Sequence, residues 1–174
     1  MAKSAKKLKK AGKLGVLPEW NLDDLYPGLD SPELKWDLEN AENRCRAFET
    51  DFKGRLAGLA GGPGAGKALT EVVKRYEALD DTLGRIGSYA QLVYAGNTTD
   101  PVRAKFCGDV QERLTAASLH LLFFTLELNR IDDAALDAAM ADPALGHYRP
   151  WLEDVRKEKP YQLEDRVEEL FHEK

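Results

Sequence analysis

The sequence has few of the residues that build a metal site or a nucleophilic active site. It contains two cysteines and three histidines in 174 residues. Cys45 and Cys107 have no CxxC spacing, which argues against a disulfide scaffold and against a cysteine-rich zinc site. Both fall on or next to helical apolar stripes, where a reduced thiol behaves as a small hydrophobic side chain. No serine, cysteine or lysine stands in a recognisable nucleophile motif.

The histidines are also too scattered to predict a metal site. No HExxH motif occurs in the sequence. Glu169 and His172 stand three residues apart, but a di-iron carboxylate bundle needs a second such pair and two further glutamates. His120 and His147 have alanines at the matching positions. We therefore predict no catalytic, cofactor-binding or metal-binding residue in this chain, and we expect Glu169 and His172 to face solvent.

Long apolar runs are missing as well. The longest, residues 119–128, is interrupted by His120, Thr125 and Glu127, so we expect no transmembrane helix. The first residues lack the apolar core of a signal peptide and the arginines of a transit peptide. These absences predict a soluble, cytoplasmic protein.

The charge distribution argues against nucleic-acid binding. The net charge is −5, although the first fifteen residues contain six lysines and no acidic residue. The rest of the chain is therefore strongly acidic and should repel a phosphate backbone. Residues 1–16 have no aromatic or arginine side chain for base stacking or phosphate contacts, so we interpret them as a flexible basic arm.

The sequence does contain three segments in which apolar residues recur at alternating steps of three and four. They cover residues 34–56, 72–93 and 106–131. This spacing places the apolar side chains on one face of a helix. A single helix cannot bury its own stripe, so the three helices should run antiparallel around one core. The predicted fold is all-α: an antiparallel bundle of three long helices followed by shorter helices, with an N-terminal non-helical strap.

Turn and capping residues set the expected boundaries. The strap covers residues 17–29, and Trp20, Leu25 and Tyr26 should plug the core. Trp36 lies off the first stripe and should cover a second contact. Asp30 or Ser31 should cap the first long helix.

The other helix ends follow from the same kind of signal. The first long helix should end near Gly58, and the second near residues 96–97. Asp100 and Asp132 should cap the helices that follow them. Within the second long helix, Gly84 and Gly87 should mark close approach of another helix, because glycine otherwise destabilises a helix by about 1 kcal/mol.

A glycine-rich connection imitates a phosphate-binding loop. Gly61, Gly66 and Lys67 match the pattern GxxxxGK[ST]. Ala68 replaces the Ser or Thr that would hold magnesium, and a helix is expected before the loop in place of a strand. Nucleotide binding is therefore not expected.

Two further features leave alternatives open. Tyr76, Tyr89 and Tyr94 lie on or beside the second stripe, where they either pack in the core or line a groove. A last helix with Leu163 and Phe171 on one side reaches residue 174 without a stop signal. It is either an ordinary fraying end or a helix that continues beyond this sequence, which is what we expect.

Two segments resemble a known family. Residues 18–26, Pro-Glu-Trp-Asn-Leu-Asp-Asp-Leu-Tyr, resemble the start of the oligoendopeptidase F group of M3 zinc metallopeptidases, and Tyr89 and Ala90 fit as well. Glu164 departs from the pattern, because members usually have serine there, and this puts the cap of the last helix in doubt. The second segment carries these matching residues: Leu145, Tyr148, Leu152, Arg156, Pro160, Tyr161, Gln162, Leu163, Glu168, Glu169, Leu170, His172, Glu173 and Lys174.

The resemblance implies a helical, clam-shaped enzyme in which an N-terminal lobe and a zinc-bearing lobe face each other across a channel for short peptides. The zinc ligands and the general base of such enzymes lie in the second lobe, in HExxH and a later glutamate. Residues 17–174 would then be the N-terminal lobe of a larger zinc metalloendopeptidase, with zinc bound outside this chain.

The resemblance also implies the partners of this chain, which are an oligopeptide substrate and the missing catalytic lobe. We expect the chain to bind neither nucleic acid nor a membrane. The alternative is a complete helical protein-interaction module with no enzymatic activity. It is motivated by the same apolar stripes and by the lack of catalytic residues.

Overall fold

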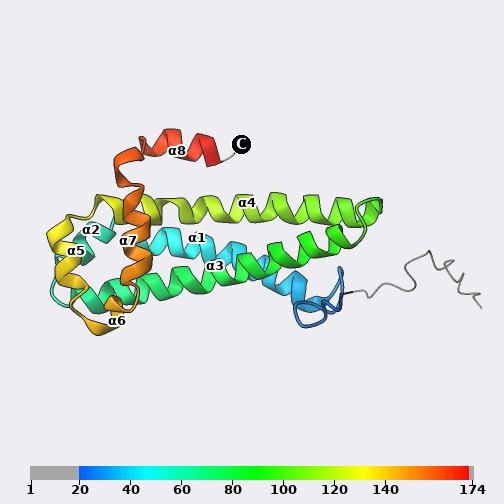
Figure 1. Cartoon of the computed structure of the whole chain (residues 1–174), viewed down its shortest axis with the longest axis horizontal. Coiled ribbons are helices and arrows are strands. Elements are labelled where there is room, and N and C mark those ends of the chain that lie inside the picture. Colours follow the sequence, from blue (N-terminus) through cyan, green and yellow to red (C-terminus); the bar gives the residue numbers. More distant parts are fainter. Residues whose placement is uncertain (1–19, 173–174) are drawn as a thin grey trace, which may run out of the picture.

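The computed structural model describes residues 20–172, and its architecture is a bundle of three long helices (Figure 1). Helix α1 spans Pro32–Phe52, α3 spans Ala65–Gly96 and α4 spans Pro101–Arg130. Successive long helices run in opposite directions, and each packs against the other two. Within the described range there is no strand, and no helix has the length and apolar character that crossing a bilayer requires. The predicted all-α class and antiparallel bundle are confirmed.

Side-chain caps begin the long helices at the predicted places. Ser31 Oγ accepts a hydrogen bond from the amide of Leu34, so the serine and not the preceding aspartate caps α1. At the start of α4, Asp100 Oδ1 accepts from the amides of Val102 and Arg103. Each bond satisfies an amide of the first turn that has no carbonyl partner within the helix.

The first long helix ends earlier than predicted. We expected its end near Gly58, but α1 stops at Phe52, and Gly54 has a φ of +79°. This left-handed conformation favours glycine and breaks the helix. A separate short helix, α2 (Leu56–Gly61), then begins and buries Leu56 completely. The glycine-rich connection is therefore partly helical.

Of the two glycines expected to mark close helix contacts, only one does so. A Cβ at Gly87 would lie 3.2 Å from Leu114 Cδ1 on α4, so the helices approach closely there. A Cβ at Gly84, which is exposed, would meet nothing within 4 Å. The prediction for Gly84 is wrong, because this residue faces solvent.

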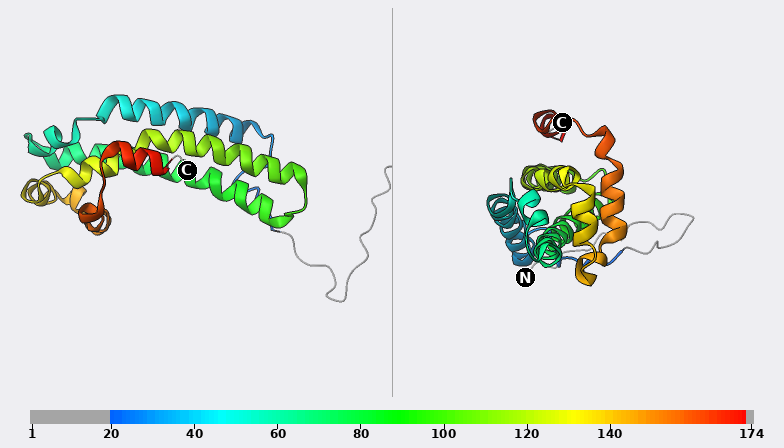
Figure 2. Two further views of the ribbon diagram at one scale, coloured as in Figure 1. Left: turned by 90° about the horizontal axis from the view of Figure 1, so that it is seen from above. Right: turned by 90° about the vertical axis from the view of Figure 1, so that its left-hand side faces the viewer.

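The shorter helices gather at one end of the bundle (Figures 1 and 2). Helices α5 (Asp133–Ala139) and α6 (Pro143–Gly146) lead into α7 (Arg149–Lys157), which crosses the bundle end. The 3-10 turn η1 (Lys159–Tyr161) follows, and α8 (Asp165–His172) turns back along α4. These helices cover the end of the core that the long helices leave open.

The strap plugs the opposite end of the core with Tyr26, which is 2% exposed, while Leu25 is half-buried. Trp20 is 77% exposed and Trp36 is 64% exposed, so the predictions that they fill contacts are wrong. Trp20 precedes the residues of the strap that pack, and Trp36 lies beside the buried face of α1 and points outward. Residues 17–19 and the predicted basic arm lie outside the described residues.

Both cysteines are buried and free, as predicted for core residues. Cys45 is completely buried on α1, and burial raises the pKa of its thiol to about 11. Cys107 lies on α4 and is 9% exposed. Cys45 therefore does not resemble a reactive cysteine, which would need a lowered pKa, and the burial of Cys107 denies it the solvent access that such a cysteine has.

Candidate functional site

No metal centre is evident in the described part of the chain. Among the described side chains of residues 20–172, which leave out those of Asp165, Glu169 and His172, no three histidine, cysteine, aspartate or glutamate groups gather as ligands of one ion. His120 and His147 lie on different elements, and the His147 ring contacts the Tyr148 ring edge-on at 5.2 Å. Glu169 and His172 belong to α8, but their side chains are outside the described set, so their predicted exposure stays a prediction.

His120 takes part in an ion-pair cluster that joins α4 to α1. Its Nδ1 lies 2.5 Å from Glu49 Oε2, and Lys53 Nζ lies 2.7 Å from Glu49 Oε1. Although burial alone would raise it, the pKa of Glu49 is held below its ordinary value by these two hydrogen bonds. The arrangement fixes two helices together and offers no free base, so this histidine has a structural role.

The glycine-rich motif is a helix start and a packing contact, not a phosphate loop. Gly64 has a φ of +74° and precedes α3, and the short helix α2 stands where a strand would be required. Gly66 is buried against the turn that joins α5 to α6. An added Cβ there would lie 2.7 Å from the Ala139 carbonyl oxygen and 2.3 Å from Asp142 Cβ.

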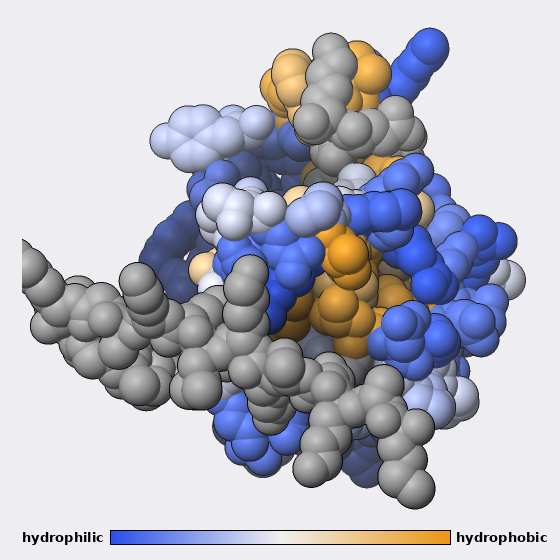
Figure 3. Space-filling model, turned by 90° about the vertical axis from the view of Figure 1, so that its right-hand side faces the viewer, coloured by the Kyte–Doolittle hydropathy of each residue, from blue (hydrophilic) through white to orange (hydrophobic). Residues whose placement is uncertain are grey.

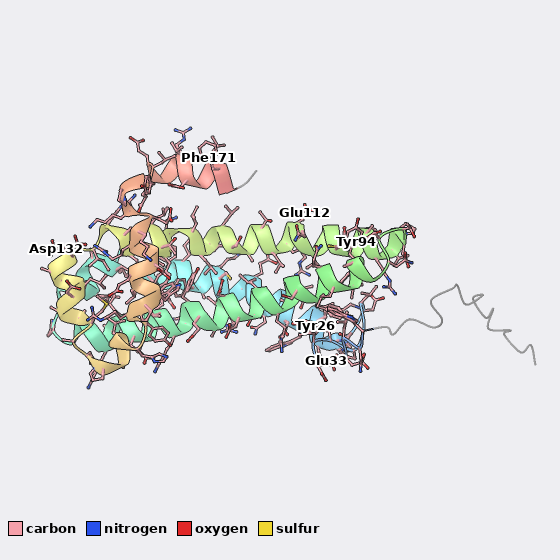
Figure 4. The ribbon with its side chains drawn as sticks, in the orientation of Figure 1. Tyr26, Glu33, Tyr94, Glu112, Asp132 and Phe171 are labelled. Carbon is pink, nitrogen blue, oxygen red and sulfur yellow. The ribbon has the colours of Figure 1, made fainter. Side chains whose placement is uncertain are left out.

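A partly buried network ties the strap to the bundle. Tyr26 Oη donates to Asp37 Oδ2 at 2.6 Å, and the Arg85 guanidinium donates to the same oxygen. The Arg85 guanidinium also lies over the Tyr26 ring, 5.0 Å from its centroid, and Tyr89 packs edge-on against that ring at 5.2 Å. Burial, with the bond to Asp37, raises the pKa of Tyr26 to about 12. The strap, α1 and α3 are therefore joined by two hydrogen bonds to one carboxylate oxygen; Figure 4 labels Tyr26, the residue of the strap that takes part.

Removing the Tyr26 hydroxyl tests this network. Tyr26→Phe should lower the free energy of unfolding by about 1 kcal/mol, the usual net value of a hydrogen bond. Because the folded pKa lies above the ordinary 10.0, the contribution is full below pH 10 and is lost as the pH rises towards 12. Absorbance at 295 nm should show one tyrosine fewer ionising near pH 12 in the variant than in the wild type. Titration of every tyrosine near pH 10 would contradict the network.

A hollow of about 950 Å³, which we call the strap groove, lies between the strap, the end of α3 and the start of α4. Arg103 crosses this region, and its Nη1 donates to the Val93 carbonyl at 3.1 Å. The groove holds aromatic and amide groups but no nucleophile beside a base, so it can contact a ligand without reacting with it. Its lining includes Trp20, Leu22, Tyr26, Tyr89, Val93 and Arg103.

The three tyrosines of α3 differ in their surroundings. Tyr76 packs in the core, with its ring centroid 4.5 Å from that of Phe124. Tyr89 is 3% exposed and both packs in the core and lines the strap groove. Tyr94 is half-buried. The sequence left core packing and lining of a groove open for these tyrosines. Tyr76 packs in the core, and Tyr89 does both.

The second family-like segment forms the covered end of the bundle. Leu145 and Leu152 are at most 1% exposed, and Tyr148 Oη donates to Glu77 Oε2 at 2.7 Å. Arg156 donates to two carbonyls at the end of α4, that of Leu128 at 2.7 Å and that of Ile131, the residue after the helix, at 2.8 Å, and also to Asp133. Arg156 thus adds a charged donor to the Leu128 carbonyl, which already accepts from the Ile131 amide at 3.3 Å, and supplies one to the Ile131 carbonyl.

Arg156 should therefore matter more than a surface arginine. Arg156→Ala should lower the free energy of unfolding by about 2 kcal/mol, because it leaves two carbonyls without their charged donor. Arg149→Ala is the matched control on the same helix: its contacts to Asp137 and Glu153 are 3.9 and 3.7 Å long and exposed. That control should change stability by less than about 0.5 kcal/mol. Equal losses of unfolding free energy for the two variants in urea denaturation would contradict the role assigned to Arg156.

Sequence reasoning missed the residues that hold these regions together. Asp37 and Arg85 are 48 residues apart and look like ordinary helix-surface charges. Asp37 is, however, only 7% exposed, and its place beside the buried stripe of α1 was the available signal. Glu127 accepts hydrogen bonds from the amides of Gly54 and Leu56, and nothing local in the sequence predicts this contact.

Comparison with known families identifies one part of the chain. A family model described as oligopeptidase F, the N-terminal domain of M3 peptidases, matches residues 127–174. This range holds the last turn of α4 and all of α5 to α8. The resemblance to an M3 oligoendopeptidase F N-terminal region is confirmed for these residues, whereas the resemblance of the strap lies outside them. Searches of curated proteins and of solved structures found no match.

Proposed function

We propose, from the match of residues 127–174 to oligopeptidase F, that this chain is the N-terminal lobe of a zinc metalloendopeptidase that hydrolyses oligopeptides. The family match is the single observation that carries the proposal. The matched residues also form a defined structural unit, since Leu145, Leu152 and Arg156 close the end of the bundle. Residues 17–174 would make up the lobe, preceded by the basic arm.

The lobe's part in the reaction is to form one wall of the substrate channel. Three long helices packed along their lengths give an elongated, stiff surface for such a wall (Figure 2). The strap groove, at about 950 Å³, has room for part of a short peptide and presents aromatic and amide groups to it. Zinc would be bound by the other lobe, where it would activate the attacking water.

The proposal includes a cytoplasmic location and no nucleic-acid or membrane partner. The acidic character of the chain after its first fifteen residues supports the absence of nucleic acid. The cytoplasmic location stays a prediction.

The reading frame of the gene tests the proposal. Sequencing the gene downstream of codon 174 should reveal a HExxH motif in the same frame, with a later glutamate as the third zinc ligand. A stop codon directly after Lys174 would contradict the proposal and favour the alternative, a complete helical interaction module. That alternative draws on one observation, the exposed apolar side chains of the C-terminal segment.

A further inference from the structure

Helix α8 and the residues just before it present apolar side chains that the bundle does not cover. Leu163, Leu170 and Phe171 are 50, 52 and 65% exposed, and Tyr161 just before them is 77% exposed. Val167, on the same side of the helix, is half-buried. The apolar surface is visible at the top of the molecule in Figure 3, and Figure 4 places Phe171 on the far side of α4 from the other long helices.

This apolar face, defined by Leu163, Val167, Leu170 and Phe171, is anchored to the bundle at its start. Gln162 Nε2 donates to the Leu126 carbonyl of α4 at 3.2 Å, which fixes the chain entering the helix. Glu168 Oε1 accepts from the amide of Leu163 at 2.8 Å, which orders the first turn. The face therefore stays beside α4 with its outer side chains in solvent.

Other exposed apolar residues do not form a comparable patch. Trp20, Trp36 and Val102 are exposed, but they lie singly on the strap, α1 and α4. Scattered apolar residues are normal on a protein surface, whereas several within one short segment, here residues 161–171, indicate an interaction site.

The occupant of this face follows from the family match and from size. The matched range includes α8, so the apolar positions of α8 belong to the segment that resembles oligopeptidase F. A second copy of the chain is a poor occupant, because two such short helices would bury far less than the roughly 1,200–2,000 Å² of a stable dimer. We infer that the apolar face of α8 docks against the polypeptide that carries the catalytic lobe and couples the two lobes. This inference rests on the proposed function.

Cysteine labelling tests the docking. Phe171→Cys and Val102→Cys replace side chains of nearly equal exposure, 65% and 64%, and the native cysteines are buried and should give little background. In the isolated chain both variants should react with a maleimide at similar rates. In the full-length parent protein, Phe171→Cys should react about tenfold more slowly, while Val102→Cys should keep its rate, because only the former is covered.

Each outcome decides a different point. Equal labelling rates of the two variants in a parent that hydrolyses peptides would overturn the docking and leave the proposed function intact. A parent without zinc-dependent hydrolysis would overturn both. Protection of Phe171→Cys in the isolated chain that increases with its concentration would identify a second copy as the occupant and overturn the inference.

Discussion

Replacing Phe48 by alanine should lower the free energy of unfolding by about 4 kcal/mol, the range found for buried aromatic residues. Phe48 is completely buried on α1 and lies at the point where α1, α3 and α4 meet. The alanine would leave a cavity that three stiff helices cannot close. The rings around it, at centroid distances of 5.1 to 6.3 Å, are Phe52, Tyr76, Phe123 and Phe124.

Phe171→Ala is the matched control for this loss. The same change at a side chain that is 65% exposed should alter the stability of the isolated chain by no more than about 0.5 kcal/mol. Urea denaturation followed by circular dichroism measures both. Similar losses in the two variants would show that Phe48 is not the centre of the core.

Replacing Gly66 by alanine should lower the free energy of unfolding by about 3 kcal/mol, although the same change usually stabilises a helix. The added methyl would lie 2.3 Å from Asp142 Cβ and 2.7 Å from the Ala139 carbonyl oxygen. The second contact is with backbone, so α3 or the turn after α5 must move. Because this turn leads into α6 and α7, the substitution should loosen the end of the bundle as well.

Gly84→Ala in the same helix provides the control. Nothing lies within 4 Å of a Cβ at Gly84, so the alanine should stabilise the chain by about 0.5 to 1 kcal/mol. Opposite signs for the two variants in thermal unfolding are the expected result. Two stabilised variants would show that Gly66 does not pack against the turn.

The helices could be predicted because their signals are local. Apolar spacing fixed the three long helices, and the caps at Ser31 and Asp100 lie within three residues of the amides they satisfy. The predicted end of α1 was wrong because the sequence does not distinguish Gly54, which adopts a positive φ, from Gly58, which is helical. Either glycine could have broken the helix, and only tertiary contacts decide which one does.

The parts of the candidate sites that could not be predicted depend on contacts between distant residues. Arg156 donates to carbonyls 25 and 28 residues away, and a pattern of residue types does not reveal backbone acceptors. The prediction that Trp20 is buried was also wrong. Large aromatic residues are usually buried, and the local sequence does not show where a strap leaves the core. Family resemblance identified the C-terminal segment, where residue chemistry alone indicated only a scaffold.

Hydrolysis of a quenched fluorogenic oligopeptide tests the central claim most directly. The full-length parent protein should cleave the peptide, lose the activity with a chelator and regain it with zinc. The 174-residue chain, measured at the same concentration, should neither retain zinc nor cleave the peptide. Zinc-dependent cleavage by the isolated chain, or no cleavage by the parent, would contradict the account of this chain as the non-catalytic lobe of a peptidase.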